Sequence, residues 1–302
     1  MNGVGWQCVA LAFAFAFALG LGCDRAPLPK PAAPPALAPA AEVPQQERFP
    51  AVETFSDIKT ILDRGTLRVG IYGHNEPFVI RTPDGKIVGG LDVELVSGLA
   101  RHLGVRAEFD LTCVHYADLF RKLHKGEIDV AVGGLSHTFA RAQYVHFSGT
   151  YVRLNQSLIM RRSELARRHI EENPFAYLET ATNAVGVLAG SSFYEYARHH
   201  FSNAIVRECS DWQEALQALG RDEVLAVLDD NNTVALLARK HPEIALDVTV
   251  YILKNMRDNI AVAISPVNPH LESCINLYLE LHDLDLDLND LMQRYPAVYR
   301  CE

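Results

Sequence analysis

Short apolar runs rich in β-branched residues recur along the chain from residue 67 onwards. Leu67–Ile71 is one such run, and in another, Ile128–Val132, apolar side chains stand at neighbouring positions. That pattern is typical of strands covered on both faces, as in a parallel sheet. Four further runs predict strands by their composition: residues 107–111, 184–188, 204–208 and 224–228.

Between these runs, apolar residues recur every three or four positions, as on one face of a helix. The spacing predicts a helix from Ser56 to Arg64 and another from Asp92 to Leu103, with Ser56 and Asp92 as their N-terminal caps. Gly104 is suited to end the second helix. Three more helices are predicted at residues 116–125, after the serine pair 191–192, and at residues 212–219.

Strands and helices therefore alternate in two groups, one on each side of Leu154. With 302 residues, of which 49% are hydrophobic, the chain is long enough for two lobes with cores. We predict two α/β lobes, each with a mostly parallel sheet and flanking helices. Ligands of open α/β sheets bind beyond the carboxyl ends of the strands. The segments to search for a site are thus residues 72–78, 133–141, 189–192 and 229–232.

The second of these segments offers groups for an anion. Arg141 carries a planar fork of donors that matches a carboxylate, and no acid stands beside it in the sequence. Ser136 and Thr138 add hydroxyl groups, and the backbone at Gly134 can be approached closely. A surface acid elsewhere in the chain is the alternative partner for Arg141.

The other segments complement this anion site. Ser191 and Ser192 open a helix, whose free N–H groups suit an anion, and Asp230 can receive an ammonium group. A helix cap is the alternative role for Asp230. Together these groups would hold a zwitterion. Three aromatic side chains can stack on its body, although Tyr116 also suits a core: Tyr72, Phe78 and Tyr116.

The N-terminus reads as an export segment. Thirteen apolar residues, Val9–Leu21, are too few for a comfortable membrane span and suit a signal peptide, predicted as residues 1–22. The pair Gly22-Cys23 resembles a bacterial lipobox, so Cys23 is the predicted lipid anchor. Asp24 resembles the signal that keeps lipoproteins in the inner membrane. An ordinary cleaved signal, or an uncleaved anchor, is the alternative.

Residues 23–50 are rich in Pro and Ala. Eight of the fifteen prolines lie there, and no apolar periodicity accompanies them. Such a segment cannot build a core but can hold a domain away from a membrane. We therefore predict a tether between the lipid anchor and the lobes.

Charge and cysteine usage exclude several classes of partner. A net charge of −9 argues against nucleic acid as the main partner. The cysteines form no CxxC pair, and the spacing of His74, His115 and His137 fits no usual ligand set. We expect no metal and no cofactor. A disulfide between Cys274 and Cys301 is predicted for an oxidising compartment.

Several motifs resemble family 3 of the bacterial extracellular solute-binding proteins, which bind polar amino acids for ABC importers. They read LRVGI, DGKIVGGLDVEL, GEIDVAVGGLSHT, FSGTY and SLIMRR, in that order. The resemblance implies the two-lobed, type II fold of periplasmic binding proteins. Residues 51–153 and 251–302 would form the first lobe and residues 154–250 the second. Two hinge strands are expected near Tyr151 and Asn259.

By position, the family's carboxylate-binding Arg corresponds to Arg141, and its ammonium-binding Asp corresponds to Asp230. The resemblance implies backbone and hydroxyl contacts at Gly134 and Ser136, a serine turn at residues 191–192, and an aromatic wall at Tyr116. Many members carry specificity residues that this chain lacks: here Tyr72, Asn75, Leu91 and Ala140 occupy those positions. A lysine-type or arginine-type preference is therefore not implied. We expect a monomer that delivers a small molecule to an ABC permease.

Two further resemblances give alternatives. FSGTYVRLNQSLIMRR and ALLARKHPEIALDVTV resemble the solute-binding module of membrane-bound lytic murein transglycosylases. The catalytic domain of those enzymes would begin near Glu302, so a periplasmic sensor of amino acids or peptidoglycan fragments competes with transport. Cyclohexadienyl dehydratases also resemble this chain, and Glu195 lies one position from their catalytic Glu, where Tyr194 stands. We predict a binding protein and not an enzyme.

Overall fold

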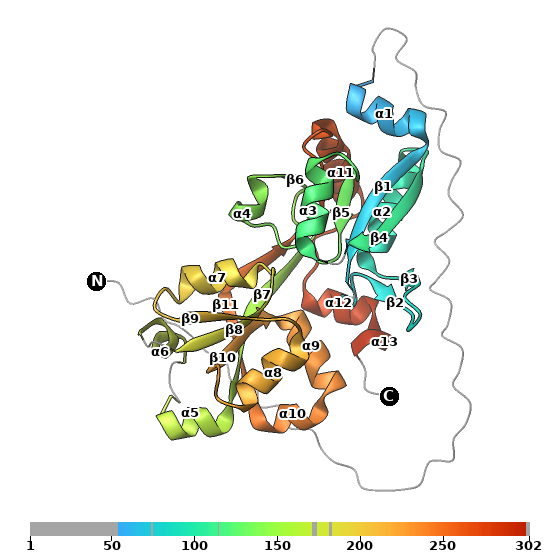
Figure 1. The fold of residues 1–302 in the computed structure, drawn as a ribbon. Helices are drawn as coiled ribbons and strands as arrows, with labels where there is room; N and C mark the ends of the chain where they lie inside the picture. Colours follow the sequence, from blue (N-terminus) through green and yellow to red (C-terminus); the bar gives the residue numbers. More distant parts are fainter. Residues whose placement is uncertain (1–53, 74, 114, 171–173, 181–182, 300–302) are drawn as a thin grey trace, which may run out of the picture. The chain divides into compact units, whose positions relative to one another are not determined.

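The computed structural model describes residues 54–73, 75–113, 115–170, 174–180 and 183–299 (Figure 1). The predicted signal peptide, the tether, Cys23, His74 and Cys301 lie outside these residues. Within them, no helix combines the length and the apolar composition that a membrane span requires. The fold is α/β, with two five-stranded sheets and a small hairpin.

The first sheet is built from strands of both ends of the folded region. Its order is β4 (Arg106–Cys113), β1 (Thr66–Tyr72), β5 (Val130–Val132), β12 (Ala263–Ile264) and β6 (His146–Phe147). Strands β4, β1 and β5 are parallel, whereas β12 runs antiparallel to β5 and to β6. Four of the five strands therefore run in one direction, as predicted, and β12, which returns from the second lobe, runs against them.

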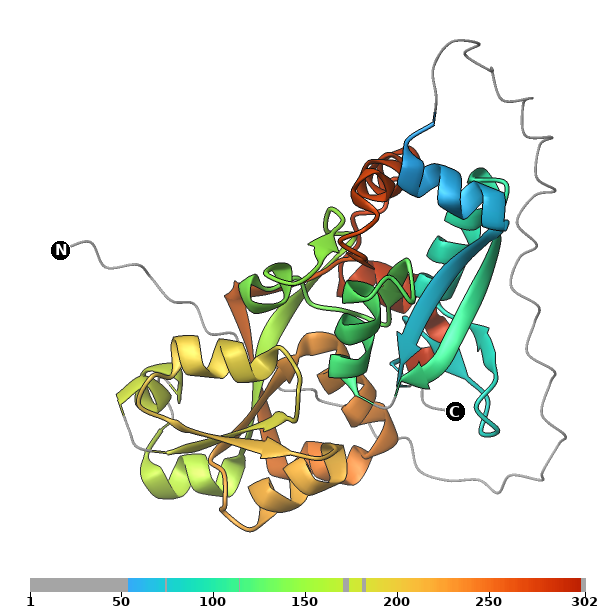
Figure 2. The ribbon, with the colours of Figure 1, turned by 45° about the horizontal axis from the view of Figure 1, so that its top comes forward.

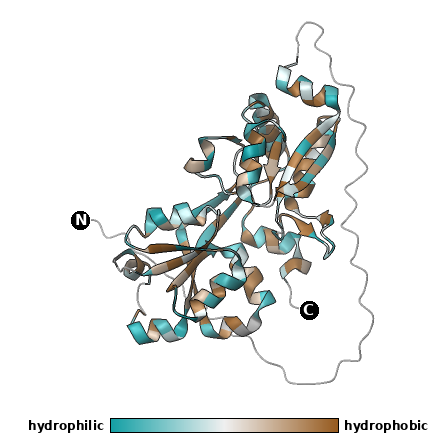
Figure 3. Ribbon diagram, in the orientation of Figure 1, coloured by the Kyte–Doolittle hydropathy of each residue, from teal (hydrophilic) through white to brown (hydrophobic). Residues whose placement is uncertain are grey.

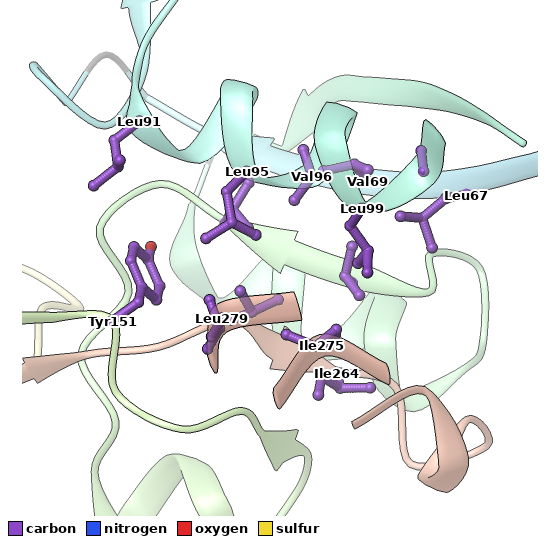
Figure 4. Packing of buried hydrophobic residues seen from close by; sticks show 14 of the residues in the cluster. Leu67, Val69, Leu91, Leu95, Val96, Leu99, Tyr151, Ile264, Ile275 and Leu279 are labelled. Carbon is purple, nitrogen blue, oxygen red and sulfur yellow. The ribbon is translucent and has the colours of Figure 1, made fainter. Parts of the chain in front are cut away.

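Helices pack on this sheet through apolar stripes. The main ones are α1 (Ser56–Arg64), α2 (Leu91–His102), α3 (Tyr116–His124) and α11 (Pro269–Leu281). Figure 4 shows Leu95 and Leu99 of α2 pointing towards Ile275 and Leu279 of α11, in one buried cluster with β1. The three-and-four spacing of the apolar residues in α2 therefore forms the core of the first lobe. The short strands β2 (Ile80–Arg81) and β3 (Ile87–Gly89) pair as an antiparallel hairpin.

The second sheet has the order β11 (Val248–Ile260), β7 (Val152–Arg161), β10 (Ala226–Asp230), β8 (Ala184–Leu188) and β9 (Ile205–Cys209). Strands β10, β8 and β9 are parallel, and β7 runs antiparallel to both of its neighbours. This sheet is also mixed. Apolar residues are concentrated on its strands (Figure 3), and two buried clusters form on it.

The helices of the second lobe are short. Two precede β8, namely α5 (Arg162–Arg168) and α6 (Pro174–Thr180), and α7 (Phe193–His200) follows it. Helix α8 (Trp212–Gly220) leads to β10, and α9 (Asn231–Lys240) and α10 (Pro242–Asp247) lead to β11. Three further helices belong to the first part of the fold or the C-terminus: α4 (Phe139–Ala142), α12 (Leu288–Arg294) and α13 (Pro296–Tyr299).

Strands β7 and β11 join the two lobes (Figures 1 and 2). They pair antiparallel from Val152 opposite Ile260 to Arg161 opposite Val248. Val152 and Ile260 are buried in the core of the first lobe, whereas other residues of both strands are buried in the second. The register shifts between Leu253 and Arg257, which marks a bulge in β11. The residues at which the lobes divide remain a prediction.

Two predicted helix caps were wrong. Phe55, and not Ser56, precedes α1, and Gly90 precedes α2. Gly90 has φ 117°, and a Cβ there would lie 2.3 Å from the carbonyl oxygen of Phe78, so only glycine fits. Asp92 lies one residue inside α2, where its side chain points into the core.

The carboxylate of Asp92 is fully buried and accepts three hydrogen bonds. Its Oδ2 accepts from the backbone N–H groups of Gly133 (2.7 Å) and Gly134 (2.9 Å), and its Oδ1 accepts from the Tyr151 hydroxyl (2.6 Å). Burial raises the pKa of Asp92 to about 6, although these three donors oppose the shift. Asp92 thus joins helix α2 to the loop after β5 and to the start of β7.

Replacement of Asp92 tests this role. Asp92→Ala leaves three buried donors without an acceptor, at about 1–3 kcal/mol each, whereas Tyr151→Phe removes only one of the hydrogen bonds. We expect Asp92→Ala to lower the free energy of unfolding several times more than Tyr151→Phe, measured by urea denaturation. Equal losses in the two variants would contradict the assignment.

Candidate ligand-binding site

Arg141 lies on the short helix α4, which follows the first sheet's β5. Its Nη1 donates to the backbone carbonyl of Ser136 (2.9 Å), and its guanidinium carbon lies 5.4 Å from the ring centre of Tyr116 and 5.2 Å from that of Phe120. Within the described ranges the guanidinium forms no ion pair with a carboxylate. Burial lowers the pKa of Arg141. The side chain is thus fixed by stacking, and it retains donors for an anion.

The surroundings of Arg141 explain two other predicted residues. Thr138 is buried and caps α4, because its hydroxyl accepts from the backbone N–H of Arg141 (3.4 Å). Tyr116 is half-buried, and burial raises the pKa of its hydroxyl to about 12. Tyr72 contacts the Tyr116 ring edge to face, with 4.6 Å between ring centres. The two tyrosines therefore form one aromatic wall beside the guanidinium.

Hydrogen bonds and close packing fix the loop at Gly133 and Gly134. Both N–H groups donate to Asp92, and the Gly133 carbonyl accepts from Nδ2 of Asn75 (3.1 Å). A Cβ on Gly134 would lie 2.5 Å from Asn75 and 2.8 Å from Phe78. Phe78 itself is buried in the core of the first lobe and packs against this loop.

Ser136 and Ser192 connect the two lobes. Their hydroxyl oxygens lie 2.7 Å apart, although Ser136 follows β5 and Ser192 precedes α7. Ser192 occupies the N-cap position of α7, but its side chain caps no backbone N–H. The neighbouring Ser191 donates to the carbonyl of Leu188 (2.7 Å). Of the serine pair, only Ser192 contacts the first lobe's site.

Asp258 on β11 belongs to the same cluster, although the sequence did not suggest it. Its Oδ2 accepts from the Ser136 hydroxyl (3.1 Å), and its Oδ1 accepts from the Tyr196 hydroxyl (3.1 Å). Burial raises the pKa of Asp258 to about 7, and the charge of Asp230 adds to the shift, whereas the two hydroxyls and Arg141 oppose it. Its position next to the predicted hinge at Asn259 was the available signal.

Asp229 and Asp230 are both buried at the end of β10. Asp230 caps α9, since its Oδ1 accepts from the backbone N–H of Thr233 (2.7 Å), so the ordinary role considered for it is present. Burial raises the pKa of both carboxyl groups, and for Asp229 the charge of Asp230 adds to the effect. The second lobe thus brings several buried acids towards a first lobe that supplies one arginine.

The remaining candidates do not join this cluster. His137 is exposed and stacks on Phe147, with 4.4 Å between ring centres, and His115 is exposed before α3. Among the described residues no group of three or more His, Cys, Asp or Glu could hold a metal ion. Cys274 forms no disulfide with the other described cysteines. Glu195, the acid of the enzyme alternative, is half-buried in the first turn of α7.

The comparison with known families fits this geometry. The profile of the bacterial extracellular solute-binding proteins, family 3, matches residues 67–295, which includes both sheets. The chain belongs to this family. The family consists of bacterial extracellular solute-binding proteins.

Two kinds of known protein are similar in sequence to this chain. The chain is 27% identical over 208 residues to the membrane-bound lytic murein transglycosylase F of Vibrio cholerae, covering 64% of this chain but only 38% of the relative. It therefore spans little more than a third of that protein. It is also 27% identical over 194 residues to the L-cystine-binding protein TcyJ of Escherichia coli, covering 63% of this chain and 69% of the relative.

Solved structures establish the two-lobed fold. The ancestral amino acid-binding protein AncCDT-1, a precursor of cyclohexadienyl dehydratase, matches with a TM-score of 0.62 at 24% identity, covering 81% of this chain and all of that structure. An amino acid ABC transporter substrate-binding protein of Streptococcus pneumoniae, bound to L-arginine, matches with a TM-score of 0.62 at 21% identity, covering 80% and 97%. The predicted fold is therefore confirmed.

The raised pKa of Asp258 has a measurable consequence for stability. Since the folded pKa of about 7 lies above the ordinary value of 3.8, this group favours the folded state at low pH, and the contribution is lost as pH rises through 7. Between pH 5 and pH 8 the loss is on the order of 2–3 kcal/mol. We expect Asp258→Asn, measured by urea denaturation without ligand, to lose less stability than the wild type over that range. Parallel pH profiles would contradict the shift.

Proposed function

We propose that this protein is an exported solute-binding protein that holds an α-amino acid, or a similar small molecule, between its two lobes. The observation that supports it is the guanidinium of Arg141, which lies between two aromatic rings and has no carboxylate partner among the described residues. A half-buried arginine of this kind suits the α-carboxylate of a ligand.

The other groups complete a zwitterion site in this proposal. Asp230 receives the ammonium group, and the hydroxyls of Ser136 and Ser192 and the carbonyl of Gly134 contribute polar contacts. Tyr116 and Tyr72 form the wall. Ser136 and Ser192 come from different lobes yet lie within hydrogen-bond distance. A ligand that contacts both lobes would favour their closure, which is a common response of two-lobed binding proteins.

We further propose that the bound molecule is delivered to an ABC permease and that the protein acts as a monomer. Relatives that bind amino acids support this role, among them an ancestral arginine-binding protein solved with glutamine, at 26% identity and a TM-score of 0.58. Cys23 would carry a lipid anchor in the inner membrane, and residues 23–50 would tether the lobes to it.

A second candidate function is a periplasmic sensor that binds amino acids or peptidoglycan fragments without transporting them. The similarity to the lytic murein transglycosylase supports it. Mass spectrometry of the molecule released from natively purified protein identifies the ligand class. A peptidoglycan fragment supports the sensor, whereas an amino acid is compatible with both candidates. A thermal-shift panel of amino acids and muropeptides then ranks the ligands, because at one concentration a tighter ligand stabilises the folded state more. A shift with muropeptides alone favours the sensor.

Arg141→Ala tests the carboxylate contact. We expect affinity for the bound amino acid to fall roughly 100-fold or more, because the ligand carboxylate would be buried without its partner, at a cost of a few kcal/mol. The free energy of unfolding without ligand should change little. Isothermal titration calorimetry measures the affinity. Arg121→Ala, an exposed arginine on α3, is the matched control and should bind normally. Unchanged affinity in Arg141→Ala would remove this residue from the site.

Asp230→Asn tests the ammonium contact without disturbing the helix. Asn is as good a helix cap as Asp, so the capping of α9 is preserved while the charge is removed. We expect weaker binding of an amino acid but an unchanged affinity for its des-amino analogue. Competition calorimetry with both compounds gives the comparison, and an equal loss for the two compounds would contradict the assignment.

A further inference from the structure

Three polar side chains lie on one face of the second sheet. Gln156 of β7 pairs directly with Asp230 of β10, and Asp258 of β11 pairs with Leu154, two residues before Gln156. Directly paired residues, and residues two apart on a strand, share a face of the sheet. Strand β7 runs between β10 and β11, so Gln156 stands between the two aspartates.

All three side chains are removed from solvent. Asp230 is 9% exposed, and Gln156 and Asp258 are each 1% exposed. The charges on this face affect one another, because Asp230 raises the pKa of Asp258 and Arg141 lowers it. Ser136 links Arg141 of the first lobe to Asp258, because its carbonyl accepts from the guanidinium and its hydroxyl donates to the carboxylate.

The amide of Gln156 has one half without a partner. Its Nε2 donates to the carbonyl of Arg257 (3.4 Å), whereas its Oε1 has no donor within the described part of the chain. A buried acceptor without a donor is unfavourable by about 1–3 kcal/mol, and such groups are rare in native proteins. An N–H donor from a ligand between Asp230 and Asp258 would satisfy it.

The charges of the site also exceed those of a simple amino acid. A zwitterion with a neutral side chain supplies one carboxylate for Arg141 and one ammonium for Asp230. Asp258 then keeps only the hydroxyls of Ser136 and Tyr196 as partners. A buried ionised carboxylate without an opposite charge nearby is unfavourable.

We propose that Gln156 and Asp258 form a subsite for a second positive charge, so that the preferred ligand is an α-amino acid with an amine or guanidine in its side chain. This inference rests on the proposed function, since it needs Arg141 and Asp230 to hold the α-carboxylate and the α-ammonium. In this proposal, residues within strands β7 and β11, rather than residues at the strand ends, distinguish basic from neutral side chains of the ligand.

Two pairs of compounds test the subsite, because each pair differs mainly in one charge. L-lysine is compared with L-norleucine, and L-arginine with L-citrulline, by calorimetry on the purified protein. We expect the wild type to bind the charged member of each pair at least tenfold more tightly. Asp258→Asn should bring that ratio close to one, and Gln156→Met should reduce it a few-fold. Glu223→Gln, an exposed acid of the second lobe that pairs with Arg207, should leave the ratio unchanged.

Three outcomes would overturn the inference. If the wild type binds norleucine or citrulline as tightly as the charged partner, the subsite is wrong and the proposed function stands. If Asp258→Asn weakens both members of a pair equally, Asp258 serves only to hold Ser136 and Tyr196 across the lobes. If no α-amino acid binds at all, the proposed function fails and the subsite fails with it.

Discussion

The buried carboxylate of Asp92 fixes the part of the first lobe from which the site is built. It binds the two N–H groups of the Gly133–Gly134 loop and the hydroxyl of Tyr151, and so positions the chain on both sides of Arg141. The loop leads to Ser136, whose carbonyl orients the guanidinium. A carboxylate is needed here because a neutral amide offers fewer acceptor positions for three converging donors.

In the second lobe, the buried charged groups near the site are carboxyl groups. Asp229, Asp230 and Asp258 are all buried, and burial raises the pKa of each. An interior with several acids and one nearby arginine favours either bound protons or bound cations. A positively charged ligand of the kind proposed would therefore bind in competition with protons on these carboxyl groups.

The sequence predicted the elements better than the contacts. Strands such as Leu67–Ile71 and helices such as α2 follow from local periodicity, and Arg141 stood out because no acid accompanied it. The antiparallel strands that make both sheets mixed depend on how distant segments return, which periodicity does not report. Asp258 and Gln156 were missed because they lie within strands and meet Asp230 only through the pairing of three strands. Asp92 was taken for a cap, because a buried acid and a capping acid look alike before the loop that it binds is known.

The bulge in β11 between Leu253 and Arg257 lies next to Asp258 and to the carbonyl that Gln156 contacts. A bulge concentrates twist and bending at one point of a strand, and here that strand is one of the two that join the lobes. In the proposed binding protein, ligand recognition and bending of the strand would therefore involve the same few residues. A ligand that binds more tightly at one bend angle increases the population of that angle. By thermodynamic linkage, the two effects have the same magnitude. Substitutions at the bulge would then tune the tightness of binding without touching the ligand.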